Sequence, residues 1–298
     1  ETIFEGDQDR IKYIQKLVGI SLTGSADFQA VIFCYGNGKN GKSTFIETLR
    51  LLFGDYFGKI TSETLLSRGK YGRNTSDYDM ADLFGKRRVV GDELSRDRSF
   101  NESLLKNLTG GDMIRARQPR EKFINFHPTH TLWMFGNHKP RIGGTDEGIW
   151  RRMKLIPFEY TIPHEDLRDQ REIFKEFEKE FPGILNWVLE GYMKYQDEGA
   201  KEPDSVKNAT LEYREDSDTL GRFMDERCTK SNSRISTRDL FRAYSSWCTT
   251  NSERGQFFHQ KGFTQALKNK GLSVSKGSSR MNFLEGYQLM EEEETMDF

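Results

Sequence analysis

The sequence has little that would suit a membrane or secreted protein. No stretch approaches the roughly 20 apolar residues that a membrane span needs, and the first residues lack the basic-then-apolar layout of a signal peptide. Cysteine is also scarce. Cys34, Cys228 and Cys248 are odd in number and widely spaced, which argues against a disulfide framework or a zinc site. We therefore expect a cytoplasmic protein, in a bacterium or a host cell, with no membrane partner.

Net charge is equally small, at −1, which argues against a protein that coats nucleic acid over its whole surface. The average hides an asymmetry. Between Arg227 and Met290, eleven Lys or Arg residues stand against three acidic ones, a balance of +8, and the segment 291–298 is acidic. A basic module could meet phosphates while the acidic tail competes for the same surface.

With 298 residues, 35% of them hydrophobic and 31% charged, the chain is longer than a usual single domain. We expect one α/β core with one or two smaller modules. The first residue is Glu1, so we expect a piece of a longer polypeptide.

A glycine-rich loop carries the clearest signal. The apolar run 28–35 predicts a buried parallel strand, and residues 42–53 repeat apolar side chains at helical spacing. The pattern G-x4-G-K-[ST] between them predicts a P-loop, whose backbone N–H groups and helix N-terminus bind phosphate. Lys42 is expected to reach the β- and γ-phosphates of ATP, and Ser43 to bind Mg²⁺. The expected nucleotide-binding residues are Gly36, Asn37, Gly38, Lys39, Asn40, Gly41, Lys42, Ser43 and Thr44.

An acidic pair, Asp92-Glu93, follows the apolar residues Val89 and Val90. We expect a core strand at 87–90 to deliver both carboxylates near the P-loop. Asp92 would hold Mg²⁺, and Glu93 would orient the attacking water. An Asp-Glu pair by itself is usually a solvated helix start, so its position about 50 residues after the loop carries the prediction.

Asn137 ends a further expected strand, 131–135, where its amide could bind the γ-phosphate and the attacking water. An asparagine also suits a plain turn. Arg151 and Arg152 precede the expected strand 153–158. One of them could act as an arginine finger on a neighbouring subunit's nucleotide, and the sequence does not decide which.

Flanking segments give coarser predictions. Residues 9–18 predict an amphipathic helix, 165–199 predict two helices broken at Pro182-Gly183, and 202–217 predict a linker.

The basic module predicts a winged helix-turn-helix: a helix capped by Ser236 or Thr237, a helix at 263–270, and a hairpin of 272–274 and 282–287. We expect Trp247 and Phe258 in its core. Its expected phosphate contacts are Lys261, Lys268, Lys270, Lys276 and Arg280. The alternative is a solvated basic face.

Taken in this order, the loop, acidic pair, Asn-ended strand and paired arginines resemble superfamily 3 helicases, specifically the phage and plasmid primase C-terminal helicases related to the poxvirus nucleoside triphosphatase. Residues 22–24, 108–117, 148–158 and 183–187 are similar to further family segments. The resemblance spans roughly residues 1–200.

The resemblance implies an AAA+ type core at 25–162, between an N-terminal helical segment (1–24) and a helical lid and linker (163–217). The winged-helix module would occupy 218–290 and the acidic tail 291–298. It also implies a homo-hexameric ring that hydrolyses ATP with Mg²⁺ and translocates on single-stranded DNA, generally 3′ to 5′, at a forked duplex. A primase or polymerase part would lie elsewhere on the parent polypeptide.

In such relatives a hairpin before the Asn-ended strand projects into the ring's channel. Here the expected strands 113–117 and 123–126 flank Arg120 and Lys122, which we expect to grip DNA phosphates. Arg115 and Arg117 share one strand face. They would line the channel or contact a neighbour's nucleotide, and the pattern leaves both readings open.

Two rival functions remain. A P-loop motor with another task, such as DNA packaging, would share the same nucleotide site. A nucleotide-switched origin-binding protein would recognise duplex DNA without unwinding it.

Overall fold

The computed structural model describes residues 1–67, 77–92, 99–143, 147–253, 255, 257, 259–277 and 281–290. Glu93, Phe258, Arg280 and the acidic tail lie outside these ranges, so the predictions for them stay predictions. The chain divides into two units. The larger contains residues 1–142 and 148–213, and the smaller contains 143–147 and 214–298.

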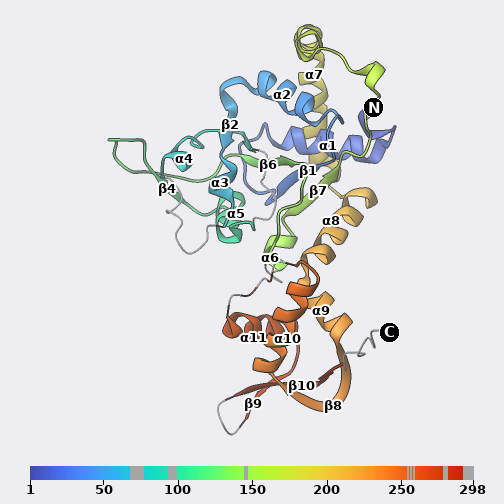
Figure 1. The fold of residues 1–298 in the computed structure, drawn as a ribbon. Helices are drawn as coiled ribbons and strands as arrows, with labels where there is room; N and C mark the ends of the chain where they lie inside the picture. Colours follow the sequence, from blue (N-terminus) through green and yellow to red (C-terminus); the bar gives the residue numbers. More distant parts are fainter. Residues whose placement is uncertain are drawn as a thin grey trace. The chain divides into compact units, whose positions relative to one another are not determined.

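A parallel sheet forms the centre of the larger unit (Figure 1). Its five strands follow the order β2-β3-β6-β1-β7. They are β1 (Val31–Tyr35), β2 (Phe57–Ile60), β3 (Arg88–Gly91), β6 (Thr131–Gly136) and β7 (Met153–Pro157). The strand predicted at 28–35 begins at Val31, and the three other predicted strands are confirmed within two residues. The edge strand β2 was not predicted, because Gly58 and Lys59 interrupt its apolar run.

Alternating side chains divide the sheet into two buried faces. Ile32, Trp133 and Ile156 pack in the cluster that contains residues of α1 (Gln8–Ile20) and α2 (Lys42–Phe53). Val31, Leu132 and Leu155 pack on the other face, with α5 (Glu102–Thr109). The parallel strands are therefore covered on both sides, as an α/β core requires. The remaining short elements of this unit are η1 (Thr2–Phe4), η2 (Gly54–Tyr56), α3 (Ser62–Leu65), α4 (Asp77–Ala81), β4 (Ile114–Ala116), β5 (Ile124–Phe126) and η3 (His164–Asp166). A further short helix, α6 (Glu147–Trp150), begins at the last residue of the segment assigned to the smaller unit.

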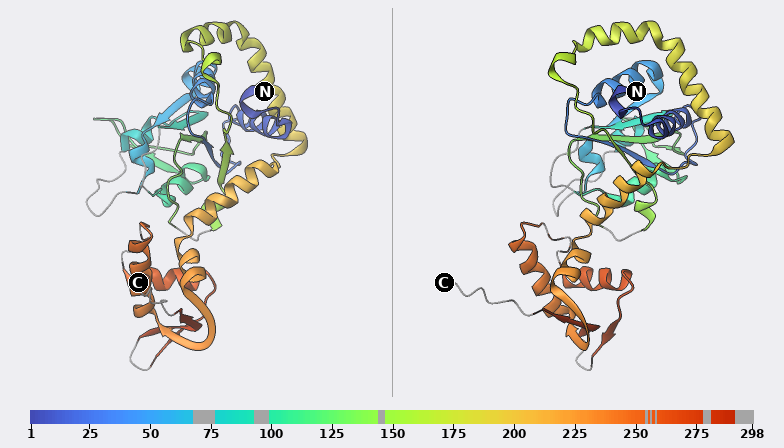
Figure 2. Two further views of the ribbon diagram at one scale, coloured as in Figure 1. Left: turned by 45° about the vertical axis from the view of Figure 1, so that its right-hand side comes forward. Right: turned by 90° about the vertical axis from the view of Figure 1, so that its right-hand side faces the viewer.

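The predicted break at Pro182-Gly183 is wrong, because α7 (Gln170–Glu198) runs through it. Figure 2 shows this helix as continuous and bent, and an internal proline is a known cause of bending. Its second half packs against α1, where Gly191 lets the Gln15 backbone approach so closely that a Cβ would lie 2.2 Å from the carbonyl oxygen. This packing compensates for the backbone hydrogen bond that Pro182 cannot make.

The linker predicted at 202–217 is also wrong, because α8 (Asp204–Ser217) is a helix. Its composition is polar, and two apolar residues seven positions apart, Val206 and Tyr213, are fully buried. The Tyr213 hydroxyl donates to the Pro140 carbonyl oxygen. A narrow buried stripe is enough to hold a helix whose other faces are solvated.

Three helices and a three-stranded antiparallel sheet make up most of the smaller unit. Ser236 accepts a hydrogen bond from the backbone N–H of Asp239, 3.0 Å away, which confirms the predicted cap. Trp247 is buried with Phe223 and Tyr244, as predicted. The polar strand at 228–236 was not predicted. The elements are α9 (Thr219–Arg227), β8 (Cys228–Ser236), α10 (Thr237–Thr250), α11 (Gln260–Asn269), β9 (Val274–Lys276) and β10 (Asn282–Leu289).

None of the helices among the described residues has both the length and the apolar character that a membrane span demands. The cysteines Cys34, Cys228 and Cys248 are buried.

Candidate functional site

The glycine-rich loop between β1 and α2 requires glycine at two positions. A Cβ on Gly36 would lie 2.1 Å from the Phe158 carbonyl oxygen. Gly41 has φ of +80°, in the left-handed region that glycine enters without strain. The Asn40 amide donates to the Phe158 carbonyl oxygen at 3.0 Å. The loop is therefore tied to the carboxyl end of β7.

Lys42 opens α2 and lies within this loop. Its side chain is buried, and its Nζ donates to the Gly36 carbonyl oxygen at 2.6 Å and to Asn40 Oδ1 at 2.9 Å. Ser43 and Lys39 are exposed beside it. The loop therefore presents backbone N–H groups, a helix N-terminus and an ammonium to the same space, which is a strong arrangement for an anion.

Asp92 and Asn137 follow the carboxyl ends of β3 and β6, as predicted. Strand β6 lies between β1 and β3, so Asn137 stands between the loop and Asp92. In a parallel α/β sheet, ligands bind at this edge. Asp92 also has a neighbour that the sequence did not reveal: Lys59 Nζ lies 2.5 Å from Asp92 Oδ1. Lys59 gave no signal because its strand was not predicted.

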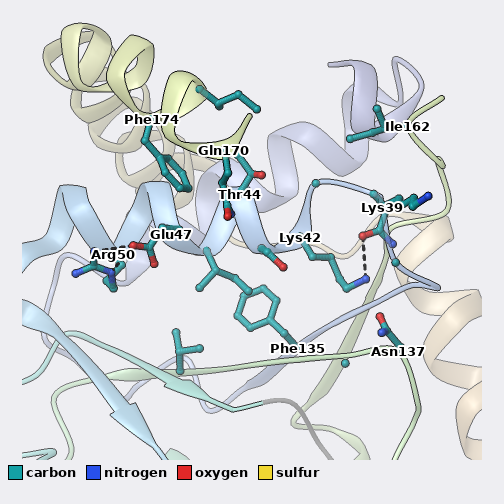
Figure 3. Close-up of a pocket in the computed structure, with 18 of the residues that line it drawn as sticks. Lys39, Lys42, Thr44, Glu47, Arg50, Phe135, Asn137, Ile162, Gln170 and Phe174 are labelled. Carbon is teal, nitrogen blue, oxygen red and sulfur yellow. Dashed lines mark hydrogen bonds and ion pairs between the residues drawn. The ribbon is translucent and has the colours of Figure 1, made fainter. Parts of the chain in front are cut away.

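A cavity of about 750 Å³ joins these groups (Figure 3). The loop residues 38–44, Asp92, Asn137 and Lys59 line one side of it. Gln170 and Phe174 of α7 reach it from above α2. Neither residue was predicted as part of the site, because their positions depend on long-range packing of α7. The cavity thus combines polar groups at the sheet edge with apolar groups from α7, which is typical of small-molecule sites.

The oxygen ligands expected for Mg²⁺ fit the chemistry of that ion. Ser43 offers a hydroxyl and Asp92 a carboxylate, both in the cavity lining. Mg²⁺ prefers oxygen and usually takes only one or two protein ligands, with phosphates and water supplying the others. In the described part of the chain, no group of three or more His, Cys, Asp or Glu residues could hold a metal ion.

Arg151 and Arg152 are not brought together with the loop. They precede β7, and Met153 pairs with Val31 at the start of β1, so both arginines lie at the amino ends of the strands, about 16 Å from the loop along the strand direction. Arg152 is 7% exposed and donates to the Gly148 carbonyl oxygen at 2.7 Å. Arg151 is exposed.

The predicted hairpin is confirmed as β4 and β5, which pair antiparallel. Ile114, Ala116 and Phe126 are buried on one face. The other face is exposed and carries Phe123, whose ring lies 4.3 Å from the guanidinium carbon of Arg115 and 4.7 Å from that of Arg117. Arg115 and Arg117 were predicted to share a face. Phe123 was not singled out, because an aromatic residue in a strand is more often core.

Arg120 and Lys122 lie exposed in the turn of this hairpin. Arg120 has φ of +64°, which is uncommon for a residue with a side chain. The turn therefore presents two cations beyond the Arg115–Phe123–Arg117 face, as the sequence led us to expect.

In the smaller unit, Lys261 and Lys268 are exposed on α11, and Lys276 is exposed at the end of β9. Lys270 forms an ion pair with Asp218, so its ammonium has a partner within the protein. The order of elements, helix, strand, two helices and two strands, places α11 directly before the β9–β10 pair.

At the amino ends of the strands of the central sheet, two titratable residues are buried. Arg88 is fully buried, with its guanidinium carbon 3.7 Å from the centre of a Trp133 ring, and none of its guanidinium nitrogens has a hydrogen-bond partner among the described residues. Burial lowers the pKa of Arg88 to about 9. His130 is likewise buried, and burial lowers its pKa to about 4.

Comparison with known proteins finds a family profile, viral relatives and a similar solved structure. The sequence profile of a family of unknown function (DUF5906) matches residues 34–152, the segment that contains Lys42, Asp92 and Asn137. The chain is 27% identical over 263 residues to "Putative helicase L207/L206" of Acanthamoeba polyphaga mimivirus, covering 82% of this chain and 27% of that protein. It is 24% identical over 281 residues to "Putative primase C962R" of African swine fever virus (strain Badajoz 1971 Vero-adapted), covering 88% of this chain and 29% of that protein. The chain thus spans under a third of the length of these viral relatives.

A solved structure described as "The apo structure of NrS-1 C terminal region (305-718)" has a similar fold. The two share 12% sequence identity with a TM-score of 0.53, covering 96% of this chain and 74% of the other. At this identity the likeness concerns the fold alone. The chain is therefore a mixed α/β protein with a parallel central sheet, and its homologues are named as helicases and primases of large DNA viruses.

Proposed function

We propose that this chain is the ATP-hydrolysing motor of a replicative DNA helicase, in a P-loop fold of the AAA+ type with a winged-helix module. One observation carries the proposal: the loop with Lys42, the carboxylate of Asp92 and the amide of Asn137 converge on one cavity at the carboxyl edge of the sheet. The mimivirus relative, which is named as a helicase, supports the same activity. The relation to the poxvirus nucleoside triphosphatase stays a prediction.

Each group has a separate task in this proposal. The loop amides and Lys42 bind the phosphates and offset charge that develops on the terminal phosphoryl group. Asn137 orients the attacking water, and Glu93 polarises it. Ser43 and Asp92 would hold Mg²⁺, which supplies neutralisation of phosphate charge when it is bound.

An arginine finger must come from another copy of the chain, since Arg151 and Arg152 lie at the far end of the strands. We assign the finger to Arg151. Arg152 is committed to Gly148 and to Gln29, whose side-chain oxygen lies 2.9 Å from Nη2. Arg151 is exposed, and its Nη2 donates to the same Gln29 oxygen at the longer distance of 3.4 Å. Releasing this one long contact would let it reach outward, which fits a ring of identical subunits, a hexamer in the proposal.

Mixed subunits test this assignment. Arg151→Ala subunits combined with Lys42→Ala subunits should regain part of the hydrolysis that each lacks alone, because one intact site can form at a mixed interface. Arg152→Ala is the matched variant, and it is expected to lower stability rather than to complement. Complementation by Arg152→Ala instead of Arg151→Ala would reverse the assignment.

The hairpin is the proposed contact with single-stranded DNA. Lys122 and Arg120 would hold phosphates, and Phe123, flanked by two guanidinium groups, offers a stacking surface for a base. Base stacking on an aromatic side chain contributes about 1–3 kcal/mol. Phe123→Ala should therefore weaken single-strand binding by about tenfold or more, with little change in DNA-independent hydrolysis. Tyr56→Ala, an exposed aromatic of the same unit, is the control.

Strand displacement on a forked substrate tests the function directly. The wild-type chain should unwind the fork with ATP, with single-stranded DNA raising its hydrolysis rate, and we expect 3′ to 5′ movement. Lys122→Ala should retain basal hydrolysis and lose unwinding. Hydrolysis that ignores single-stranded DNA, with no displacement, would contradict the helicase.

A second candidate is a nucleotide-switched protein that binds duplex DNA at an origin. The smaller unit favours it, because α11 exposes Lys261 and Lys268 directly before the β9–β10 pair, as in a winged helix whose second helix enters the major groove. Tight, sequence-selective duplex binding without displacement would support this reading over the helicase.

A further inference from the structure

Lys59 is a cation in the nucleotide cavity that the proposed function has not used. It lies on the edge strand β2, is exposed, and places Nζ 2.5 Å from Asp92 Oδ1. Both residues line the cavity with the loop and Asn137.

The sheet register brings this pair together. Ile60 pairs with Gly91, and the Asp92 backbone N–H donates to the Ile60 carbonyl oxygen at 3.2 Å. The side chains of Lys59 and Asp92 are 68% and 37% exposed. Ion pairs with this exposure contribute little to stability. The pair lies beside the phosphate-binding loop, and we therefore relate it to ligand binding and not to the stability of the fold.

Three other cations of the cavity have partners of their own, while the exposed Lys39 of the loop also lines it. Lys42 donates to Gly36 and Asn40. Arg50 donates twice to Glu47 Oε1, at 2.6 and 2.8 Å. Arg168, also in the lining, is held by both oxygens of Glu176. Lys59 differs from these, because its partner is the carboxylate expected to hold the metal ion.

An ammonium and a metal ion compete for the same carboxylate oxygens. Mg²⁺ requires short, regularly placed oxygen contacts, which a lysine on Asp92 obstructs. When a metal–nucleotide complex enters, Lys59 loses its partner while a triphosphate arrives in the same cavity. The four-carbon stem of lysine allows its ammonium to move to a new anion.

We propose that Lys59 exchanges Asp92 for the terminal phosphate oxygens when a metal–nucleoside triphosphate binds. Lys59 then senses the γ-phosphate, and it returns to Asp92 once the γ-phosphate has left. This inference rests on the proposed nucleotide site and adds a residue that distinguishes the triphosphate from the diphosphate.

Two binding measurements test the exchange without relying on turnover. The first uses a non-hydrolysable β,γ-imido analogue of ATP, with ADP for comparison. Lys59→Ala should weaken analogue binding by about tenfold or more, since a charge-assisted contact to phosphate is lost, and should leave ADP affinity nearly unchanged. Lys59→Arg should keep most of the analogue affinity.

The second measurement follows Mn²⁺ by electron paramagnetic resonance in the presence of ADP, where no γ-phosphate competes for Lys59. Removing the ammonium should lower the half-saturating Mn²⁺ concentration, by about threefold for an exposed pair of this kind. Lys207→Ala is the matched control, because Lys207 forms an exposed ion pair with Asp204 on α8.

The outcomes separate the exchange from the nucleotide site. Unchanged analogue and Mn²⁺ binding in Lys59→Ala would overturn the exchange, and if Lys42→Ala still lost nucleotide in the same experiment, the site itself would stand. Equal losses for the analogue and for ADP would also overturn it. A wild-type chain that binds neither nucleotide would remove both the site and the exchange.

Discussion

The two ends of the central sheet differ in whether their charged and polar side chains are accessible and have partners. At the carboxyl ends of the strands, Lys59, Asp92 and Asn137 line an open cavity in which each has a partner or access to one. At the amino ends, Arg88 and His130 are buried, and their side-chain nitrogens have no hydrogen-bond partner among the residues described. Both ends belong to the same five strands.

This contrast indicates that ligand binding and catalysis belong to the carboxyl edge of the sheet. Polar groups at the carboxyl edge can change partners when a ligand enters. Arg88 is packed against the faces of Trp133 and Phe45, so its charge gains cation–π attraction but loses solvation. We expect changes at the carboxyl edge to alter hydrolysis and changes at the amino end to alter stability.

Lys42→Ala should lower hydrolysis more than any other change, and a normal rate in this variant would contradict the contrast between the two ends of the sheet. Removing a charge that faces the transferred phosphoryl group should lower hydrolysis by at least about a hundredfold. Steady-state release of phosphate measures this. Lys12→Ala, which alters an exposed lysine of α1 outside the cavity, is expected to stay within about threefold.

Asn137→Ala comes next. Losing one neutral donor at the reacting phosphate should lower kcat by about ten- to a hundredfold, with a smaller change in nucleotide affinity. Single-turnover hydrolysis and analogue binding separate the two. Asn125→Ala, on the exposed face of β5, provides the control. A loss confined to affinity would show that Asn137 binds nucleotide without serving the chemical step.

Arg88→Met tests the expectation that changes at the amino ends of the strands alter stability. Replacing a buried, unpaired charge by an apolar side chain should raise the free energy of unfolding at pH 7 by about 1–3 kcal/mol, with hydrolysis unchanged. Urea denaturation measures the gain, and the exposed Arg171→Met should shift it by less than about 0.5 kcal/mol. A less stable Arg88→Met would mean that the aromatic contacts outweigh the lost solvation.

The same residue predicts a pH effect. Its pKa is lower in the folded chain, about 9, than in the unfolded chain. Between these values the unfolded chain binds more protons, so the Arg88 contribution to stability rises with pH above about 9. The gain from Arg88→Met should therefore shrink at alkaline pH.

His130 gives the smallest predicted effect. Its folded pKa of about 4 lies below the ordinary value near 6.5, so acid protonates the unfolded chain first. Its contribution to stability is therefore lost progressively as pH falls from about 6.5 to 4. At pH 5 the loss should amount to at most about 2 kcal/mol. The change in unfolding free energy between pH 7 and pH 5 should be smaller in His130→Leu, and the exposed His164→Asn should match wild type.

Much of the carboxyl edge was predictable because its signals are local. The apolar run before Gly36, the glycine pattern and the helix after Lys42 lie within about 25 consecutive residues, and α2 has the predicted bounds. Asp92 and Asn137 could be placed because each follows an apolar strand. Parallel pairing then brings strand ends to a common edge.

The failures concern long-range packing. Pro182 indicates a helix break, and the packing of the second half of α7 against α1, where Gly191 permits a close approach, explains why α7 continues. The polar composition of residues 204–217 predicts a linker, but Val206 and Tyr213 are buried in the core and the segment is a helix. Lys59 was not predicted as a site residue, because it meets Asp92 only through the pairing of β2 with β3. The register between two strands cannot be read from the local sequence. Arg88 looked like an ordinary flank of an apolar strand.

Equilibrium binding of a fluorescent ATP analogue with Mg²⁺, compared between Lys42→Ala and Arg88→Met, is the decisive measurement for a nucleotide site at the carboxyl edge. Lys42→Ala should weaken binding by at least about tenfold, and Arg88→Met should bind as wild type does. Equal affinities for wild type and Lys42→Ala, or a loss in Arg88→Met as large as in Lys42→Ala, would contradict a nucleotide site at the carboxyl edge.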